Sequence, residues 1–163
     1  EEAINTHVKG AVLDEIWKSL EKSTWIQDGQ DNAEKIIYVF NDANCPYCHT
    51  VWQNARPLVE SGKVQLRHIM VGVIRPSSKG QAATLLQSTN PVEAFKIFNQ
   101  SNGKNKIKEM TNIPKNLSDQ LDANTALLDK YGFYATPALV WKNNKGEIES
   151  MQGLPKDINK LLN

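Results

Sequence analysis

Cysteine is scarce in this sequence. Only two of the 163 residues are cysteines, and both lie in the stretch NDANCPYCHTVW at positions 41–52. Long apolar runs are also missing, because the longest are the size of a β-strand and far short of the roughly 20 residues that a membrane-spanning helix needs. The sequence therefore predicts no membrane span.

An excess of charge of one sign is missing as well. The chain has 19 basic and 18 acidic residues and a formal net charge of +1. Proteins that bind nucleic acid usually cluster Lys and Arg on one face, and tails that bind membrane surfaces carry blocks of like charge. The charges here are interspersed, so we expect no nucleic-acid partner.

The length and composition favour one folded domain. Hydrophobic residues make up 40% and charged residues 23%, which is ordinary for a globular protein. The opening EEAINTHVKG has no Met, no basic region and no apolar region of a signal peptide, so we interpret the chain as a processed product or a fragment. We expect a linker or leading helix over residues 1–24 and a catalytic domain over 25–163.

A strand–helix–strand pattern surrounds the cysteines. Residues 35–40 and 64–74 are apolar runs typical of strands buried on both faces. Between them, apolar residues recur at helical spacing until Gly62, with a kink expected at Pro57 because proline removes one backbone donor. This predicts a βαβ unit with two parallel strands.

The rest of the chain is predicted to add helices and a hairpin. Residues 7–22 carry apolar residues at helical spacing, and residues 76–131 are expected to form a helical insertion containing a polar loop at 99–117. Residues 135–153 predict two strands around a turn, and 154–163 a closing helix. The predicted fold class is therefore α/β.

Within the insertion, cap residues mark where helices begin. Asn90, followed by Pro91 and Glu93, has the pattern of a helix N-terminus, and Ser118 is expected to cap a later helix that ends at Gly132.

The cysteine pair has three interpretations without redox chemistry. A structural disulfide would close only a four-residue loop and contribute roughly 2 kcal/mol, less than a bridge between distant cysteines. A zinc site needs four ligands, and the chain has one cysteine pair and the three imidazoles of His7, His49 and His68. Two inert buried thiols are the third.

Redox chemistry is favoured over these because of where the pair lies. Cys45 stands between a strand and a helix, where unpaired N–H groups and the helix dipole stabilise a thiolate. Pro46 suits the first helical position. Cys48 is one turn further on, so we expect an exposed nucleophile, Cys45, and a shielded partner, Cys48. Of their neighbours, His49 is interpreted as a solvated residue of the first helical turn in preference to a catalytic base, and Trp52 is expected to pack in the core or line a substrate surface.

Thr136-Pro137 is a second landmark, just before the predicted strand ALVW. Proline cannot donate to a β-ladder, so it belongs at the start or edge of a strand. It either simply begins the strand or forms a cis-proline that faces the cysteines; the residues alone leave both open.

Together these features resemble the thioredoxin fold, with a helical insertion between the βαβ unit and the cis-proline strand. More narrowly, the chain resembles the catalytic domain of the DsbC/DsbG group of bacterial periplasmic disulfide isomerases and reductases, in its DsbG-like form. The likeness lies in residues 38–76, in Thr136-Pro137-Ala138 and in Gly153-Leu154-Pro155.

The resemblance implies a function and site residues. Cys45 matches the attacking cysteine and Cys48 the resolving cysteine of a thiol:disulfide oxidoreductase that isomerises or reduces wrong disulfides, or reduces sulfenylated cysteines. The expected substrate-binding residues are Pro46, Tyr47, Thr136 and Pro137. No metal and no cofactor beyond the dithiol is implied.

The resemblance also implies partners. Group members act on proteins in the periplasm and receive electrons from the membrane reductase DsbD. They are homodimers joined through a separate N-terminal domain, which this sequence lacks, so dimerisation through this chain is not expected. Two alternatives stay open: a glutaredoxin-like reductase, which also uses Cys-Pro-Tyr-Cys, and a peptide-binding chaperone module with idle cysteines.

Overall fold

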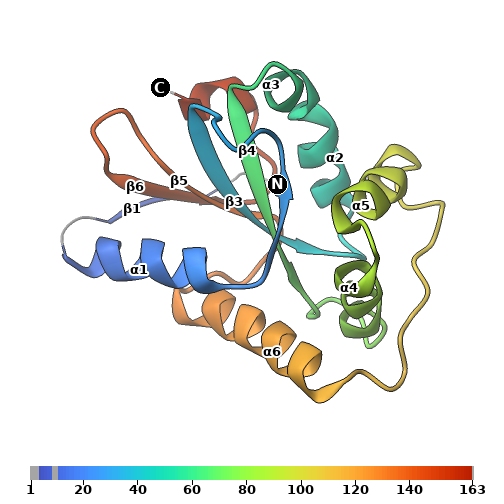
Figure 1. Ribbon diagram of the computed structural model, residues 1–163. Coiled ribbons are helices and arrows are strands. Elements are labelled where there is room, and N and C mark those ends of the chain that lie inside the picture. Colours follow the sequence, from blue (N-terminus) through green and yellow to red (C-terminus); the bar gives the residue numbers. More distant parts are fainter. Residues whose placement is uncertain (1–3, 9–10, 163) are drawn as a thin grey trace.

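A six-stranded sheet organises the molecule in the computed structural model, which describes residues 4–8 and 11–162 (Figure 1). The strand order is β1-β6-β5-β3-β4-β2. The strands are β1 Ile4–Val8, β2 Trp25–Asp28, β3 Lys35–Asp42, β4 Val64–Val71, β5 Ala138–Lys142 and β6 Ile148–Gln152. The helices are α1 Ala11–Lys22, α2 Pro46–Asn54, α3 Arg56–Glu60, α4 Ser78–Gln87, α5 Pro91–Gln100, α6 Lys115–Lys130 and the 3₁₀ helix η1 Ile158–Leu162.

The βαβ unit is confirmed at the centre of this sheet. β3 and β4 pair in parallel, with Asp42 opposite Val71 at their carboxyl ends. β5 runs antiparallel to β3 and places Ala138 opposite Phe40. The end of β3, the end of β4 and the start of β5 therefore meet at one edge of the sheet, and the cysteine motif and Thr136-Pro137 are brought to that edge.

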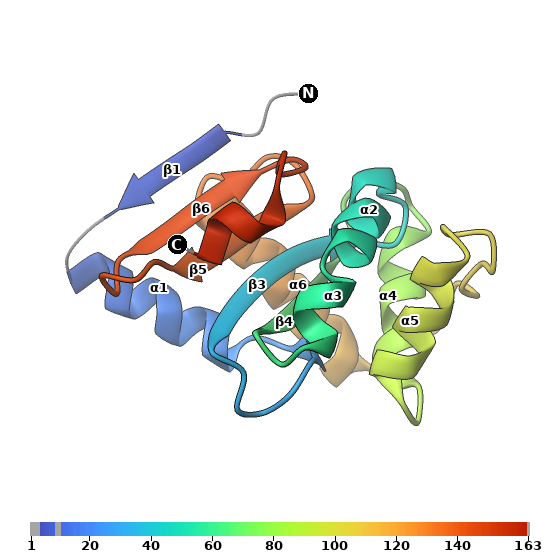
Figure 2. The same cartoon turned by 90° about the horizontal axis from the view of Figure 1, so that it is seen from above.

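Two layers of helices cover the sheet because side chains alternate across a strand. Tyr38 and Phe40 of β3 face α1 and α6, which lie on one side in Figure 1. Ile37 and Val39 face the other side, where they pack with residues of α2, α3 and η1 (Figure 2). β3 is thus buried on both faces, which explains its continuous apolar sequence.

The helical insertion forms a third hydrophobic cluster against α2. Phe95 and Phe98 of α5, Leu117 and Leu121 of α6 and Trp52 of α2 pack together, with small residues of α4 between them. α4 and α5 lie beside α2 in Figure 1. Three helices between β4 and β5 confirm the predicted insertion.

The predicted helix over residues 7–22 is wrong at its start. α1 begins at Ala11, and Ile4–Val8 instead form the edge strand β1, which pairs antiparallel with β6. This pairing gives the backbone of β6 hydrogen-bond partners on its outer side. The spacing of apolar residues along the sequence does not reveal such an effect. The segment before residue 25 therefore contributes a strand to the sheet, while the domain boundary placed there stays a prediction.

Other boundaries differ in ways that packing explains. α6 begins at Lys115 after Pro114, four residues earlier than a helix capped by Ser118, because Leu117 is drawn into the core. The predicted closing helix is confirmed, and it is the short 3₁₀ helix Ile158–Leu162. The predicted kink at Pro57 is confirmed as a break between α2 and α3.

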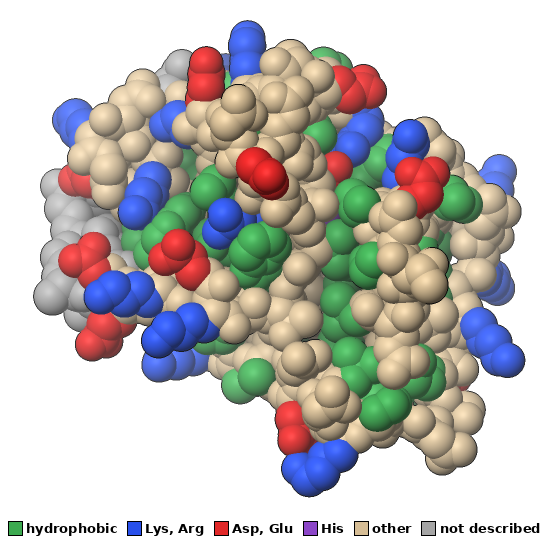
Figure 3. Space-filling model, in the orientation of Figure 1, with side chains coloured by type: hydrophobic (Ala, Val, Ile, Leu, Met, Phe, Trp, Pro, Cys, Tyr) green, Lys and Arg blue, Asp and Glu red, His purple; other side chains and the backbone are tan. Residues whose placement is uncertain are grey.

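Charge is mixed on the surface. Both Lys and Arg side chains and Asp and Glu side chains are spread over the face shown in Figure 3. Among the residues that the structure describes, no helix is both long and apolar enough to cross a membrane.

Candidate active site

Cys45 and Cys48 are joined by a disulfide at the start of α2. Cys45 is the N-cap residue, with extended backbone angles (φ −103°, ψ 109°), and its sulfur accepts a hydrogen bond from the backbone N–H of Cys48 at 3.2 Å. Pro46 occupies the first helical turn, where its missing N–H leaves no partner unpaired. The predicted position of Cys45 at a helix N-terminus is therefore confirmed.

The expectation that Cys45 is exposed is wrong for this disulfide form. Only 2% of Cys45 and 3% of Cys48 are accessible to solvent. As the N-cap, Cys45 turns its sulfur inward over the first turn of α2, towards the Cys48 to which it is bonded. The exposed part of the motif is Pro46-Tyr47, and Tyr47 is 43% exposed.

Thr136-Pro137 is a cis peptide bond, as one of the two interpretations predicted. Pro137 is buried and its carbonyl accepts a hydrogen bond from the N–H of Gly153 at 2.8 Å. Because Ala138 lies opposite Phe40, the dipeptide runs alongside the end of β3, from which the chain leads to Cys45. The hydroxyl of Thr136 is buried and has no hydrogen-bond partner among the described residues.

Exposed apolar side chains gather around this edge. Tyr47 follows Cys45, Val73 and Ile74 follow β4, and Tyr134 precedes the cis-proline. Each is between 43% and 74% exposed. All four lie in segments that begin or end at the strand ends where the disulfide and the cis-proline are found, and their apolar side chains are exposed there.

The loop before Cys45 is tied to the insertion, which sequence reasoning missed. The side-chain amide of Asn44 donates to the hydroxyl of Ser78 at 2.8 Å and to Gln81 at 2.9 Å. Asp42, at the end of β3, is buried. The available signal was the pair Asn41-Asp42, two polar residues that extend an apolar strand to the cysteine motif.

His49 is buried rather than solvated. It is 7% exposed, its Nδ1 donates to the Oδ1 of Asn99 at 2.8 Å, and its ring meets Phe98 edge to face. The side-chain N–H₂ of Asn99 donates to the carbonyl of Phe95, which leaves Oδ1 to accept from His49. His49 therefore connects α2 to α5.

Trp52 belongs to the core. It is 3% exposed, and the Arg56 guanidinium carbon lies 3.6 Å from the centre of its ring. This contact settles the choice left open by the sequence in favour of packing.

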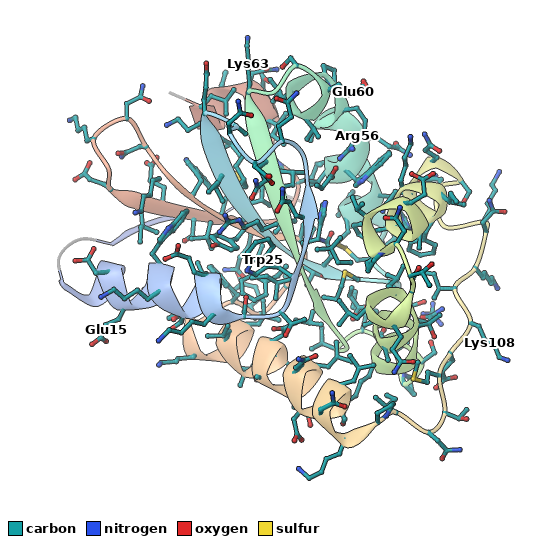
Figure 4. The ribbon with its side chains drawn as sticks, viewed as in Figure 1. Glu15, Trp25, Arg56, Glu60, Lys63 and Lys108 are labelled. Atoms are coloured by element: carbon teal, nitrogen blue, oxygen red, sulfur yellow. A yellow bond between two sulfur atoms is a disulfide. The ribbon has the colours of Figure 1, made fainter. Side chains whose placement is uncertain are left out.

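A buried polar network joins β2, β4 and the start of α3, next to α2. Asp28 accepts hydrogen bonds from both terminal nitrogens of Arg56, which is labelled in Figure 4, and from Nε2 of His68 at 2.9 Å. Nδ1 of His68 accepts from the side-chain amide of Asn41 at 2.9 Å.

The network shifts two pKa values. Burial by itself raises the pKa of Asp28, but the hydrogen bonds from His68 and Arg56 outweigh it and hold that pKa far below its usual range. Burial lowers the pKa of His68, against the opposing effect of Asp28. Both lowered pKa values are consistent with an ionised Asp28 beside a neutral His68, whose Nε2 donates to Asp28 and whose Nδ1 accepts from Asn41.

A metal site is not visible in the described part of the chain, where no three His, Cys, Asp or Glu side chains come together.

Comparison with known proteins shows the family to which this chain belongs. A model of the thioredoxin-like domain matches residues 26–163. The sequence is 40% identical to the thiol:disulfide interchange protein DsbG of Pseudomonas aeruginosa over 155 residues, 95% of this chain and 60% of that protein. It is 41% identical to DsbG of Escherichia coli over 145 residues, 86% of this chain and 57% of that protein. The chain thus spans less than two thirds of either relative.

Solved structures support the same fold. A periplasmic thioredoxin-like protein from Salmonella enterica serovar Typhimurium superposes with a TM-score of 0.71 at 15% identity, covering 95% of each chain. The sequence is DsbG-like over most of its length, and the chain belongs to the family of thioredoxin-like domains.

Proposed function

We propose that this chain is the catalytic domain of a periplasmic thiol:disulfide oxidoreductase, which isomerises or reduces non-native disulfides, or reduces sulfenylated cysteines, in secreted proteins. The observation that carries the proposal is the Cys45–Cys48 disulfide at the N-terminus of α2, at the sheet edge that also holds the cis Thr136-Pro137 bond. The similarity to DsbG proteins supports it.

The reaction begins with the reduced form. An external dithiol supplies two electrons and two protons, so that the Cys45–Cys48 bond breaks and the donor becomes a disulfide. The Cys45 sulfur is then favoured as a thiolate, since the backbone N–H of Cys48 lies 3.2 Å from it and the positive end of the α2 dipole faces it.

Exchange then proceeds by sulfur substitution. The Cys45 thiolate attacks a substrate sulfur, forms a mixed disulfide and releases the other substrate sulfur as a thiolate. With a sulfenic acid, the attack releases water after one proton is taken up. If Cys48 attacks next, the substrate leaves reduced and the Cys45–Cys48 bond returns; if a substrate thiol attacks, the substrate leaves with a different disulfide.

Four residues are proposed to bind the substrate. Pro46 and Tyr47 are exposed next to the disulfide, and the backbone beside the cis bond of Thr136-Pro137 is proposed to pair with an extended polypeptide. The dithiol itself is the only redox group required. DsbD as electron donor, and dimerisation of a longer protein through an N-terminal domain, are part of the same proposal.

The test uses the two cysteines as each other's controls. Reduced wild-type protein, Cys45→Ser and Cys48→Ser are incubated with a protein that carries scrambled disulfides and with a sulfenylated peptide. We expect Cys45→Ser to lose both activities, and Cys48→Ser to accumulate a mixed disulfide through Cys45.

Two outcomes would favour the alternatives. Full protection of unfolded peptide by Cys45→Ser, with no exchange by wild type, would identify a chaperone module. Efficient turnover that requires glutathione as the reductant would identify a glutaredoxin-like reductase.

A further inference from the structure

Asp42 is buried three residues before Cys45 and accepts four hydrogen bonds. Oδ1 accepts from the backbone N–H of Asn44 at 2.9 Å and from the hydroxyl of Ser78 at 2.7 Å. Oδ2 accepts from the backbone N–H groups of Val73 at 2.8 Å and Ile74 at 2.9 Å. The side chain is 2% exposed. It joins three segments: the loop that leads to Cys45, the turn after β4 and the start of α4.

The network around Asp42 has no spare acceptor. Ser78 is fully buried, and its oxygen already accepts from the backbone N–H of Arg75 at 3.1 Å and from the Asn44 side chain at 2.8 Å. Its own proton is therefore directed at Asp42. Every atom that faces Asp42 in this network is a donor, so the group fits only as a carboxylate.

The turn after β4 is also held by close packing. A Cβ atom added to Gly72 would lie 2.7 Å from both the backbone nitrogen and the Cα of Lys79, in the first turn of α4. Such contacts do not occur in real proteins, so the turn approaches α4 as closely as a backbone can. This observation is independent of the hydrogen bonds and indicates that the position of the turn is fixed.

The same turn presents two apolar side chains to solvent. Val73 is 45% and Ile74 46% exposed, although their backbone N–H groups are bound inside to Asp42. They follow Val71, which is the register partner of Asp42 in the sheet. A buried charge thus anchors an exposed apolar pair at the edge that carries the disulfide.

We propose that Asp42 is a positioning residue for thiol–disulfide exchange, which holds Val73 and Ile74 beside Cys45 as a contact for apolar side chains of the substrate polypeptide and whose buried charge restrains ionisation of Cys45. The inference rests on the proposed function. The electrostatic part follows from sign: the N-terminus of α2 favours a thiolate at Cys45, and a buried carboxylate three residues earlier, at the end of β3, opposes it because solvent screens it little.

Asn is the informative substitution at this position. If the amide oxygen faces Val73 and Ile74, the NH₂ group faces the backbone N–H of Asn44 and the hydroxyl of Ser78. Neither can accept its hydrogen bonds, because both lone pairs of the Ser78 oxygen are already used. Reversing the amide places the NH₂ group against two backbone N–H groups. Asp42→Asn therefore removes the charge and loosens the turn, with little change in volume.

The first readout is the titration of Cys45 in reduced protein, followed by thiolate absorbance or alkylation rate. The matched control is Asp28→Asn, a buried aspartate of β2 whose register partner is Leu66, far along β4 from Val71. We expect the midpoint to fall by about one pH unit in Asp42→Asn, as for one nearby charge, and to stay in place in Asp28→Asn. A midpoint that stays or rises in Asp42→Asn would overturn the electrostatic part.

The second readout separates binding from chemistry. Val73→Ser/Ile74→Ser is expected to raise KM about fivefold for an apolar disulfide-linked peptide, to leave kcat unchanged, and to leave the reaction with hydroxyethyl disulfide unaltered. Val92→Ser/Ile97→Ser, which changes two exposed apolar residues of α5, is the matched control. An unchanged KM, or an equal change with both disulfides, would refute the contact.

A further variant covers the case in which Asp42→Asn does not fold. Ser78→Ala removes one donor but keeps the charge, so KM for the peptide should rise while the Cys45 midpoint does not fall. A fall would show that disorder alone shifts the titration and would overturn the inference. The proposed function has its own test: it fails if reduced wild-type protein exchanges no disulfide. The Cys45 titration needs no turnover, so the two failures can be told apart.

Discussion

Replacing Asp28 with asparagine is expected to destabilise the protein without touching the cysteines. Asp28 is 5% exposed and receives three hydrogen bonds, two from Arg56 and one from His68. Oδ2 accepts from both partners, whereas Oδ1 accepts from Arg56 at 3.1 Å. An amide oxygen can replace only one of these two oxygens, so its NH₂ group must face a donor of Arg56.

The size of the effect follows from that loss. One charge-assisted hydrogen bond is worth about 1.5–3 kcal/mol, and removing one partner of a buried ion pair costs about 3–5 kcal/mol. The Arg56 side chain is 21% exposed, so water relieves part of the cost. We expect Asp28→Asn to lower the free energy of unfolding by about 2–3 kcal/mol near pH 7.

The pH dependence has a definite sign. Because the pKa of folded Asp28 lies far below its usual value of 3.8, its contribution to stability is complete above about pH 4 and is lost as the pH falls towards the folded pKa. His68, whose pKa is lowered in the fold, also favours unfolding as the pH falls below about 6.5. The difference in free energy of unfolding between wild type and Asp28→Asn should therefore become smaller below about pH 4.

Urea unfolding of oxidised wild type and Asp28→Asn, followed by tryptophan fluorescence at several pH values from 7 to 3, measures both effects. A double-mutant cycle with Arg56→Met isolates the ion pair. A difference below about 0.5 kcal/mol at pH 7, which is typical of surface changes, would refute this reasoning, and so would a difference that does not depend on pH.

Three further substitutions test other parts of the structure. Trp52→Ala should lower the free energy of unfolding by about 3–5 kcal/mol, because it leaves a cavity between α2 and the insertion and removes the ring on which Arg56 stacks. Thermal unfolding measures this loss, and a loss below about 1 kcal/mol would mean that the ring does not pack in the core. Gly72→Ala should lower the melting temperature by several degrees, because its Cβ would collide with the backbone of Lys79; a neutral result would contradict the close approach. His49→Ala should cost about 1–3 kcal/mol through the unpaired buried Asn99, while the disulfide still forms; free-thiol titration after oxidation checks the second point, and a protein that cannot form the bond would assign His49 a different role.

The sequence predicted most of the fold because its strongest signals are local. The apolar run at 35–40 marks a strand buried on both faces, and Pro57 marks a helix break, since each acts through its own backbone or immediate neighbours. It failed for Ile4–Val8, where the partner strand lies more than a hundred residues away, and for the start of α6, which depends on where Leu117 finds the core.

The candidate site also combines local features that the sequence shows with features that depend on distant parts of the chain. Its cysteines, their place at the start of a helix and the Thr-Pro dipeptide are visible in the sequence, because spacing and residue type specify them. The cis bond at Pro137 was one of two open readings, and the burial of Cys45 and His49 was not anticipated, because accessibility depends on the elements that pack above a residue.

By itself, the amino-acid order determined where a pair of thiols would meet a helix N-terminus and which strands would flank it. Only the tertiary structure decided what surrounds the site: that Asp42 accepts hydrogen bonds from three segments, that His49 reaches Asn99 on another helix, and that Val73 and Ile74 are exposed after the end of β4. The physical reason is range. Backbone preferences act within a few residues, whereas hydrogen bonding and burial join groups that only the folded chain brings together.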